Sequence, residues 1–453
     1  MTLYPYQVEG VRRLVNQRCV LFADDMGLGK TVQAAVAMRQ LFDADAIRRV
    51  LVVCPVSIMR NWRKEIVRWA PGLPAVLYEG AHRYGMLEGN ARILIGSYET
   101  ITEDLRRPTC NGRAFCDIGL DLLVLDEAQR IKAPGSFRSR ILSRILSARR
   151  WALSGTPLEN HPRDLNSILR FLFPNEYATG ESINDLELML QLRTSCLMRR
   201  TKDEVEIQLP ARTVSYIPVQ LCPDQASEYE QTLANVRSSL VGARSKSAVS
   251  SGLLAGLQKL RRITAVSGSG SSAKLDLISD ELEVLAELGE KTVVFSSYAN
   301  LALPVALDRL KRYRPVLFTG AMTQHDRELA HRSFTDNPNC LVMCASLRSA
   351  GVGLTWTVAR HVYHLDLWWN PQAIRQAEDR VHRIGQRQPV FLRRLVAERT
   401  IDEGIVSLLE SKDDLFRFVI DGAAPTPREQ RLDSLLNLVG LRRQDLEEDA
   451  LQD

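Results

Sequence analysis

The stretch FADDMGLGKT, residues 22–31, joins a short apolar run to a helical pattern. It is the strongest indication of the fold, and the other motifs gain their meaning from it. Its glycines let the backbone curve closely, so that N–H groups can point at phosphate oxygens. Lys30 would neutralise the β- and γ-phosphates, and the Thr31 hydroxyl would bind Mg²⁺. Asp24 stands where the strict pattern has glycine. The stretch predicts a phosphate-binding loop whose nucleotide contacts are Asp25, Met26, Gly27, Leu28, Gly29, Lys30 and Thr31.

Two carboxylates follow a second apolar run, in LLVLDEAQ at 122–129. Asp126, at the end of the predicted strand, could hold Mg²⁺ opposite Thr31, and Glu127 could orient and deprotonate the attacking water. Such a pair alone is usually a solvated loop. Downstream of a phosphate-binding loop it predicts a site for ATP and Mg²⁺, with Lys30, Asp126 and Glu127 as catalytic residues.

A basic stretch in the second half, residues 376–386, is expected to open as a helix. Arg380 and Arg383 are three residues apart, so both would project from one helix face. Guanidinium groups brought across a cleft can stabilise the charge that develops on the γ-phosphate. Without the surrounding motifs they would be ordinary surface arginines. His382 is expected to pack or to form a hydrogen bond, not to act as a base.

Short apolar runs alternate with helical patterns in both halves, which predicts an α/β fold with parallel sheets covered on both faces. Residues 224–266 are helix-like and polar, and the SGSGSS run after them has the composition of a flexible linker. The predicted strands are 19–23, 50–54, 93–97, 122–125 and 151–154 in the first half, and 292–296, 315–319, 340–345, 362–365 and 390–396 in the second. We expect a first lobe at 1–215 with a helical insertion at about 160–200, a helical protrusion and linker at 216–272, a second lobe at 273–422 and a helical tail at 423–453.

Composition is that of a globular protein, with 45% hydrophobic and 25% charged residues. The net charge of +5 permits a polyanionic partner without requiring one. The eight cysteines show no metal-ligand spacing, and Cys54, Cys340 and Cys344 lie in or beside apolar runs, as core residues do. No signal peptide or membrane span is recognisable. We expect a soluble intracellular protein, in the cytoplasm or nucleoid of a prokaryote or phage, or in a eukaryotic nucleus.

The motifs resemble, in order and spacing, those of the Swi/Snf-type ATPases of helicase superfamily two, over roughly residues 3–415. The resemblance implies two RecA-like lobes with family-specific helical protrusions, adenine recognition by Gln7, and an ATP-driven motor. It also accounts for Asp24, because the family carries an acidic pair before its glycines. The matching stretches are LYPYQVEGV at 3–11, DDMGLGKT at 24–31, DEAQ at 126–129, LSGTPLEN at 153–160, LMRRTK at 197–202 with LP at 209–210, VFSSY at 294–298 and WWNP at 368–371.

Some residues depart from the family pattern. Gln129 replaces a histidine that many members have, and Ala350 and Thr355 replace glycine and asparagine. These departures favour the branch of annealing-type motors, or compact bacterial and phage members. Gly351 and Gly353, in the same stretch, are further candidates for nucleotide binding. No accessory module is recognisable, so nucleosome remodelling is not expected.

The resemblance also implies a groove for double-stranded DNA. Hydroxyls and basic side chains at strand ends suit backbone contacts that do not read sequence. A loop cap or a solvated charge would explain any one of them equally well. Trp62, Trp69, Trp368 and Trp369 are expected to pack in cores or between lobes, not to stack on bases. The candidate DNA contacts are Ser57, Arg60, Lys64, Ser97, Tyr98, Thr319, Gly320, Ser346 and Arg348.

These observations favour an ATP-dependent translocase that moves along double-stranded DNA without processive strand separation. A second hypothesis is a motor subunit of a restriction, defence or repair assembly, with a protein partner bound by the C-terminal helix. That helix, which carries Leu432, Leu435, Leu436 and Val439 at helical spacing, could equally pack on the second lobe. An inactive DNA-binding scaffold and a strand-separating helicase are the remaining alternatives. A membrane partner is not expected.

Overall fold

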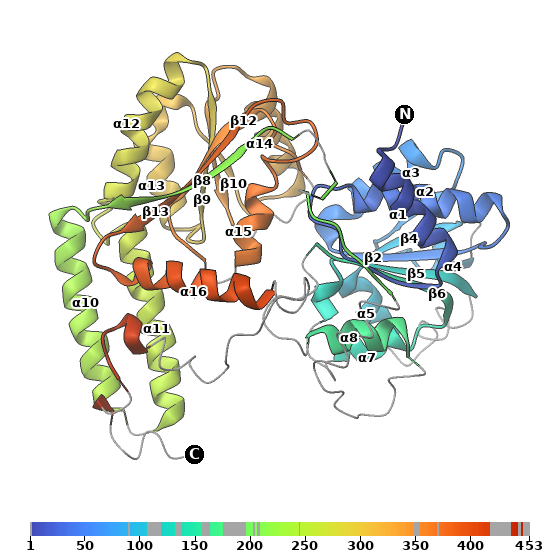
Figure 1. Ribbon diagram of the computed structural model, residues 1–453, viewed down its shortest axis with the longest axis horizontal. Helices are drawn as coiled ribbons and strands as arrows, with labels where there is room; N and C mark the ends of the chain where they lie inside the picture. The colour runs from blue at the N-terminus through green and yellow to red at the C-terminus, as the bar shows by residue number, and fades with distance from the viewer. Residues whose placement is uncertain are drawn as a thin grey trace. The chain divides into compact units, whose positions relative to one another are not determined.

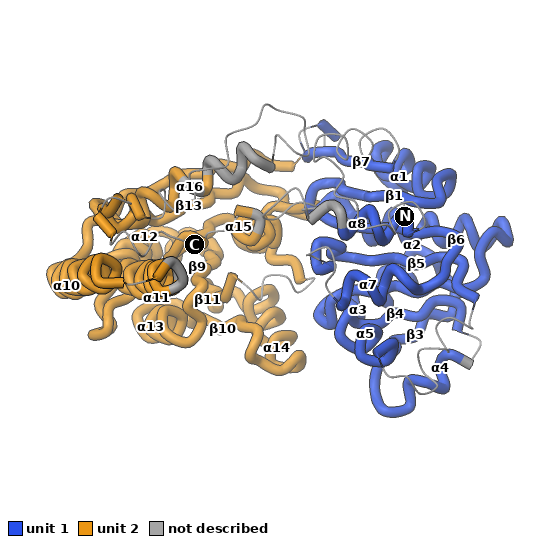
Figure 2. Tube along the Cα trace, turned by 90° about the horizontal axis from the view of Figure 1, so that it is seen from below, with its two compact units in different colours: residues 1–208, 419–421 blue, residues 209–418, 422–453 orange. Residues whose placement is uncertain are grey.

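The chain divides into two compact units in the computed structural model (Figure 2). The structure describes residues 2–88, 91–106, 119–131, 137–155, 164–174, 196–202, 204–205, 209–243, 245–347, 354–368, 371–416, 436–442 and 445–446. The first unit holds the described residues up to 205, and the second those from 209 onward. The predicted boundary after residue 215 therefore falls inside a strand of the second unit, β8 (Arg212–Val219).

The first unit is built on a seven-stranded sheet in the order β3-β4-β2-β5-β6-β1-β7, and every pairing is parallel. All five strands predicted in this half are confirmed, to within a few residues. The strands are β1 (Cys19–Phe22), β2 (Val50–Cys54), β3 (Ala75–Tyr78), β4 (Ile93–Ser97), β5 (Leu120–Asp126), β6 (Ser147–Leu153) and β7 (Leu197–Met198). The helices are α1 (Pro5–Asn16), α2 (Lys30–Asp43), α3 (Met59–Trp69), α4 (Gly85–Glu88), α5 (Tyr98–Arg106), α7 (Phe137–Ser143) and α8 (Asp164–Leu172), with 3₁₀ turns η1 (Val56–Ile58) and η2 (Ala128–Ile131).

The strand order decides where a site can form in this unit. Because all strands run the same way, the carboxyl ends of β1, β5 and β6 lie at one edge of the sheet. The strands β2 and β4 are buried along their whole length, as an apolar strand covered on both faces should be. Cys54, at the end of β2, is buried as predicted.

The second unit has a six-stranded parallel sheet in the order β10-β11-β9-β12-β13-β8. Along β11 (Val342–Ser346), Val342 and Cys344 enter the hydrophobic core on one face, while Met343 and Ala345 enter the core on the other. The other strands are β9 (Lys291–Ser296), β10 (Val316–Phe318), β12 (Ala359–His364) and β13 (Val390–Ala397). The helices are α10 (Pro223–Val241), α11 (Lys246–Ala265), α12 (Ala273–Glu287), α13 (Ala302–Arg309), α14 (Gln324–Asp336), α15 (Pro371–Glu378) and α16 (Ile401–Phe416), with the 3₁₀ turn η3 (Lys311–Tyr313).

The helical region predicted at 224–266 is confirmed as the antiparallel hairpin α10–α11, which projects from the sheet of the second unit (Figure 1). The serine-rich run after it, however, is a hydrogen-bonded turn and not a flexible linker. Ser267 N–H donates to the Ser271 carbonyl at 2.9 Å, and the Ser272 hydroxyl donates to Ala265 O at 2.6 Å while accepting from Leu275 N. The composition misled because serine side chains can also satisfy backbone groups in a turn and cap the next helix.

The described part of the tail packs on the second unit. Leu436 and Val439 are buried in one cluster with residues of α10, α11 and α16. The Arg237 guanidinium of α10 donates to Val439 O at 2.6 Å. The apolar side chains at these two positions thus pack within the second unit. Leu432 and Leu435 lie outside the described residues. None of the helices searched in the described part is both long and apolar enough to cross a bilayer.

Candidate nucleotide-binding site

The phosphate-binding loop lies between the end of β1 and the first residue of α2. Gly27 and Gly29 have φ of 88° and 75°, in the left-handed region that residues with a side chain adopt at a cost. A Cβ at Gly29 would also lie 2.8 Å from Gln7 Nε2. The Leu28 carbonyl accepts hydrogen bonds from Tyr6 Oη at 3.1 Å and Gln7 Nε2 at 3.3 Å. Helix α1 therefore holds the tip of the loop, which places Gln7 against it.

Lys30 is turned into its own loop. Its ammonium donates to the carbonyl oxygens of Asp24 at 2.6 Å and Asp25 at 3.2 Å. Burial lowers the pKa of Lys30, while the charges of Asp24, Glu127, Asp126 and Asp25 act in the opposite direction. The lysine and the carboxylates at the end of β5 are therefore close enough to influence one another, although almost a hundred residues separate them.

Asp126 is a buried carboxylate with fixed orientation. Trp62 Nε1 donates to its Oδ2 at 2.7 Å, and the backbone N–H of Glu127 donates to its Oδ1 at 2.8 Å. The Tyr98 hydroxyl donates to its carbonyl oxygen at 2.8 Å. Burial, followed by the negative charge of Glu127, raises the pKa of Asp126 to about 7. The carboxylates of Asp126 and Glu127 thus repel each other, with little solvent to screen their charges.

The residues present fit a magnesium ion. Each Asp126 oxygen uses one lone pair in the bonds just described and keeps capacity for a cation. A divalent cation would offset the unfavourable proximity of the Asp126 and Glu127 charges, and Mg²⁺ prefers oxygen ligands of this kind. Thr31, the second residue of α2, adds a hydroxyl oxygen. Among the described residues no group of three or more His, Cys, Asp and Glu forms a metal cluster.

Glu127 is held by a relay of two side chains, Gln129 of η2 and Ser154 just after β6. Ser154 Oγ donates to Gln129 Oε1 at 2.7 Å, and Gln129 Nε2 donates to Glu127 Oε2 at 2.6 Å. Glu127 has a φ of 52°, an uncommon conformation for a residue with a side chain. The amide of Gln129 can accept and donate at the same time, so it joins the residue after β6 to the carboxylate predicted to activate water.

The acidic pair of the loop is clamped by two arginines that immediately follow β7. Arg200 forms a two-pronged ion pair with Asp24, from Nε to Oδ1 at 3.1 Å and from Nη2 to Oδ2 at 2.5 Å. Arg199 pairs with Asp25 at 3.1 Å. Asp24 has no exposed surface, so its charge depends on this partner. The sequence identifies residues 197–202 only as a family segment and does not predict these ion pairs, because nothing local links the two stretches.

Gly155, which follows β6, lies against the same loop. A Cβ at this position would be 2.5 Å from Met26 Cγ and 3.3 Å from Lys30 Nζ. Glycine at this position therefore lets the backbone of the LSGTPLEN motif, residues 153–160, approach Met26 and Lys30 closely. The rest of that motif, from Thr156 to Asn160, lies outside the described residues.

In the second unit, Arg380 and Arg383 contact the same short segment. Arg380 Nη1 donates to Leu354 O at 3.1 Å, and Arg383 Nη1 to Thr355 Oγ1 at 3.2 Å. The prediction that both project from one helix is wrong, because α15 ends at Glu378 and the chain continues in turns toward Gly385, whose φ is 106°. Glu378 is itself buried and is paired with Arg394 of β13 at 2.8 Å, which fixes the end of the helix.

His382 lies in the same turns and forms a hydrogen bond, as expected. Its Nε2 is 2.9 Å from the carbonyl oxygen of Pro210, so this nitrogen carries the proton. Gly351, Gly353 and Arg348 lie outside the described residues, as does Trp369.

The candidate DNA contacts separate into exposed and buried groups. Arg60 and Lys64 are exposed one turn apart on α3, with Ser57 half-buried just before that helix. Ser97 and Tyr98 are 1% and 0% exposed, so their side chains present almost no surface to a phosphate, and their contact with DNA stays a prediction. Ser97 instead bonds Thr100 at the start of α5, and Tyr98 supports Asp126.

In the second unit, the predicted contacts lie at the carboxyl edge of the sheet. Gly320 is exposed just after β10, whereas Thr319 and Ser346 keep only 6% and 5% of their surface. Of the tryptophans, Trp62 is fully buried, and Trp69 and Trp368 are partly buried against hydrophobic cores, as expected.

Comparisons with known proteins place the chain in a family. The SNF2-related domain matches residues 6–268, and the helicase conserved C-terminal domain matches residues 273–385. The ISWI chromatin-remodeling complex ATPase ISW1 of Saccharomyces cerevisiae is 29% identical over 464 residues, which cover 92% of this chain and 40% of that protein. YwqA of Bacillus subtilis, named provisionally as an ATP-dependent helicase/translocase, is 30% identical over 462 residues, which cover 91% of this chain and 48% of YwqA. The chain thus spans less than half the length of these relatives.

A solved structure, the Sulfolobus solfataricus SWI2/SNF2 ATPase core in complex with dsDNA, covers 97% of this chain and 97% of its own, with 27% identity and a TM-score of 0.45. The SNF2-related domain alone matches more than half of the residues, and the helicase C-terminal domain follows it directly. The first match covers the first unit and continues through β8 and the α10–α11 hairpin of the second, and the second match lies within the second unit. The chain belongs to the SNF2-related family of helicase-like proteins.

Proposed function

We propose that the chain is a DNA-stimulated ATPase that uses hydrolysis to move along double-stranded DNA without processive strand separation. The observation that carries this proposal is the convergence of Lys30, Asp126 and Glu127 at the carboxyl edge of the first sheet, in a chain of the SNF2-related family. Their arrangement supports phosphoryl transfer to water, a reaction that depends on positioning and on charge stabilisation.

Binding of ATP would change the partners of Lys30. Its ammonium would leave the carbonyls of Asp24 and Asp25 for the β- and γ-phosphate oxygens, while the backbone N–H groups of Gly27 and Gly29 face the phosphates. Gln7, fixed against the loop, would contact the adenine. Thr31 and Asp126 would hold Mg²⁺, which when bound supplies positive charge to the phosphate oxygens.

Glu127 would accept the proton of the attacking water. Its carboxylate is oriented by Gln129, which is oriented in turn by Ser154. This relay gives the residues after β6 a route to affect hydrolysis, because a shift of Ser154 moves Gln129 and withdraws a hydrogen bond from the base. Gly155, the next residue, is close enough to Lys30 that a Cβ there would lie 3.3 Å from Lys30 Nζ.

Completion of the site would require the second unit. Arg380 and Arg383 would leave Leu354 and Thr355 for the γ-phosphate, where guanidinium charge stabilises the transition state. Hydrolysis would then be coupled to closure of the two units, and repeated closure on a duplex would produce movement. Duplex contact would use exposed basic residues such as Arg60 and Lys64, and it would weaken as salt rises.

The test is ATP hydrolysis with Mg²⁺, measured without nucleic acid and with duplex DNA, single-stranded DNA or RNA. Lys30→Ala removes the phosphate contact, and Lys311→Ala, an exposed residue of η3, is the matched control. Stimulation by duplex in wild type and control, abolished in Lys30→Ala, supports the proposal. Stimulation by single strands or RNA alone would contradict the duplex substrate, and a wild type that binds ATP but is never stimulated would indicate that a protein partner is required.

A further inference from the structure

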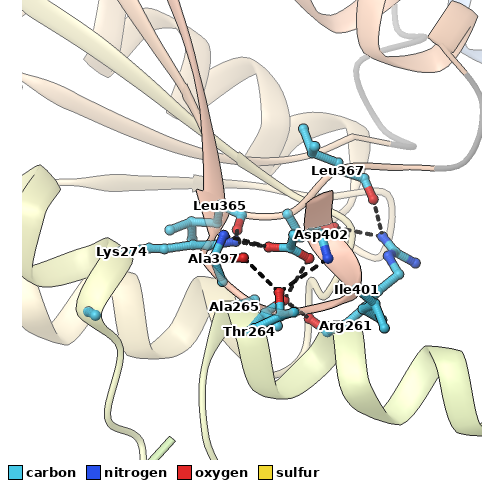
Figure 3. Close-up of polar contacts among 12 residues, drawn as sticks. Arg261, Thr264, Ala265, Lys274, Leu365, Leu367, Ala397, Ile401 and Asp402 are labelled. Atoms are coloured by element: carbon cyan, nitrogen blue, oxygen red, sulfur yellow. Dashed lines mark hydrogen bonds and ion pairs between the residues drawn. The ribbon is translucent and has the colours of Figure 1, made fainter. Parts of the chain in front are cut away.

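Helix α11 of the helical hairpin places one fully buried arginine against the segment that follows β12 in the second sheet. Arg261 is 1% exposed, and its Nη2 donates to the Asp366 carboxylate at 3.1 Å and to the Leu367 carbonyl at 2.7 Å. Figure 3 shows the Arg261 guanidinium reaching the Leu367 carbonyl. A buried guanidinium needs such partners, because its charge is costly when left without them.

Asp366 also accepts hydrogen bonds from the backbone turn that follows β9. It accepts a hydrogen bond from Ser296 Oγ at 2.5 Å and another from Ser297 N at 3.0 Å. Ser296 Oγ also accepts from the backbone N–H of Tyr298 at 3.0 Å. The turn at residues 296–298 is therefore shaped by one carboxylate whose charge is matched by Arg261.

The same turn is tied to α11 at a second point. The Tyr298 hydroxyl donates to Gln258 O at 3.0 Å, less than one helical turn before Arg261. The Arg261 guanidinium also lies over the rings of Tyr298 and Trp368, at 5.6 and 5.1 Å from their centroids. Helix α11 thus holds both the turn after β9 and the segment after β12.

These two segments lie beside the residues proposed to contact DNA. Strand β9 pairs with β11, with Ser296 opposite Ser346, and Leu347 N donates to Ser296 O at 3.0 Å. Strand β10, which Thr319 and Gly320 follow, is the next strand beyond β11. The turn that Arg261 controls is therefore adjacent to the carboxyl ends of β11 and β10.

We propose that Arg261 is a positioning residue through which the hairpin α10–α11 sets the geometry of the DNA-binding edge of the second unit. It acts through Asp366 and the turn at 296–298, without touching DNA. This inference rests on the proposed function for the identity of the ligand, while the positioning itself is a property of the folded chain.

The same unit supplies a matched control. Lys274 of α12 is also buried, and its ammonium pairs with Asp402 at 2.6 Å and donates to Leu365 O at 3.0 Å (Figure 3). Asp402 accepts a further hydrogen bond from Thr264 Oγ1, also of α11. Loss of this cation would destabilise the unit in the way that loss of Arg261 would, but none of these bonds reaches the turn at 296–298.

The experiment compares Arg261→Met, Arg261→Lys and Lys274→Met in the full chain, well below the lowest of their melting temperatures. The first readout is the duplex concentration that gives half-maximal stimulation of ATP hydrolysis. Arg261→Met should raise it about tenfold, while the rate at saturating duplex falls less, because the edge is misplaced but the hydrolytic residues are not. Arg261→Lys should restore part of the loss, and Lys274→Met should stay within about twofold of wild type.

The second readout does not depend on DNA. Hydrogen exchange at the amides of Ser297 and Tyr298 should speed up in Arg261→Met much more than in Lys274→Met. Equal changes in the two variants, in exchange or in half-saturation, would overturn the positioning role. A wild type that no nucleic acid stimulates would overturn the proposed function instead, and the exchange comparison would still decide the role of Arg261.

Discussion

Arg200 and Asp24 are 176 residues apart in sequence and form an ion pair in the phosphate-binding loop, where two guanidinium nitrogens donate to the carboxylate. Arg200 also donates to the backbone oxygen of Tyr6 and to Gln33 Oε1, the latter at 3.0 Å. One side chain thus ties β7, α1 and α2 to the loop. The acidic residue that replaces the usual glycine is therefore part of the framework that holds the loop in place.

Arg200→Met should destabilise the first unit by about 3 kcal/mol, because it leaves the buried Asp24 charge without its partner. Hydrogen exchange of the β1 and α2 amides in increasing urea would measure the loss. The double variant Asp24→Asn with Arg200→Met removes both charges and should recover at least half of the stability. No recovery would show that the ion pair is not the source of the effect.

Glu127→Gln should lower the rate of ATP hydrolysis by about 10²- to 10⁴-fold while ATP binding changes little, because the amide cannot accept a proton from water. Single-turnover hydrolysis and the ATP dissociation constant give the two values. A variant that keeps a tenth of the wild-type rate would rule Glu127 out as the general base.

Gln129→Ala should reduce kcat about tenfold with little change in KM for ATP, since it frees the Glu127 carboxylate from the Ser154 relay. Ser154→Ala, which removes only the outer bond of the relay, should have a smaller effect in the same direction. If both variants hydrolyse ATP at the wild-type rate, the relay has no part in the reaction.

Arg60→Ala and Lys64→Ala should each weaken duplex binding and lower the slope of log affinity against log salt by about one. The control is Arg48→Ala, an exposed residue of the same unit that precedes β2 and so lies at the opposite edge of the sheet. Titrations at several salt concentrations would measure the slopes. An equal effect of all three variants would indicate nonspecific attraction by charge alone.

The stability of the second unit should depend on Glu378 in acid. Burial by itself raises the pKa of Glu378, but the Arg394 charge, together with His364 at 3.3 Å from the carboxylate, outweighs it and holds this pKa at about 2. Because the folded value lies below the unfolded value, the pair stabilises the fold above about pH 4.5, and the contribution of about 3 kcal/mol is lost as pH falls toward 2. Glu378→Gln should be less stable than wild type at pH 6, and the difference should shrink at pH 3. A difference that stays constant would contradict this linkage.

Much of the fold could be predicted because its central strands are continuous apolar runs. The strands that were missed lie at sheet edges: β3, the two-residue β7, and β8, which is exposed along most of its length. Edge strands are held by pairing with a neighbour more than by their own pattern. Because the sequence does not predict β8, the predicted boundary between the units lies inside that strand instead of before it.

The candidate site was predictable where chemistry is local to a motif, as at Lys30 and at the Asp126–Glu127 pair. It was not predictable where partners come from distant segments, as with Arg200, with Trp62 on Asp126, and with Arg261 on Asp366. Tyr98 follows a strand end, where the sequence predicts a ligand contact. The structure shows that Tyr98 is buried and that its hydroxyl donates to the Asp126 carbonyl, a supporting contact that the sequence does not reveal.

The most direct test of the central claim is displacement of a triplex-forming strand from duplex DNA, driven by ATP and Mg²⁺ and measured beside a forked duplex of the same length. The account predicts that the wild type displaces the triplex strand, leaves the forked duplex paired, and loses the activity in Lys30→Ala. Separation of the fork without triplex displacement would contradict movement along double-stranded DNA.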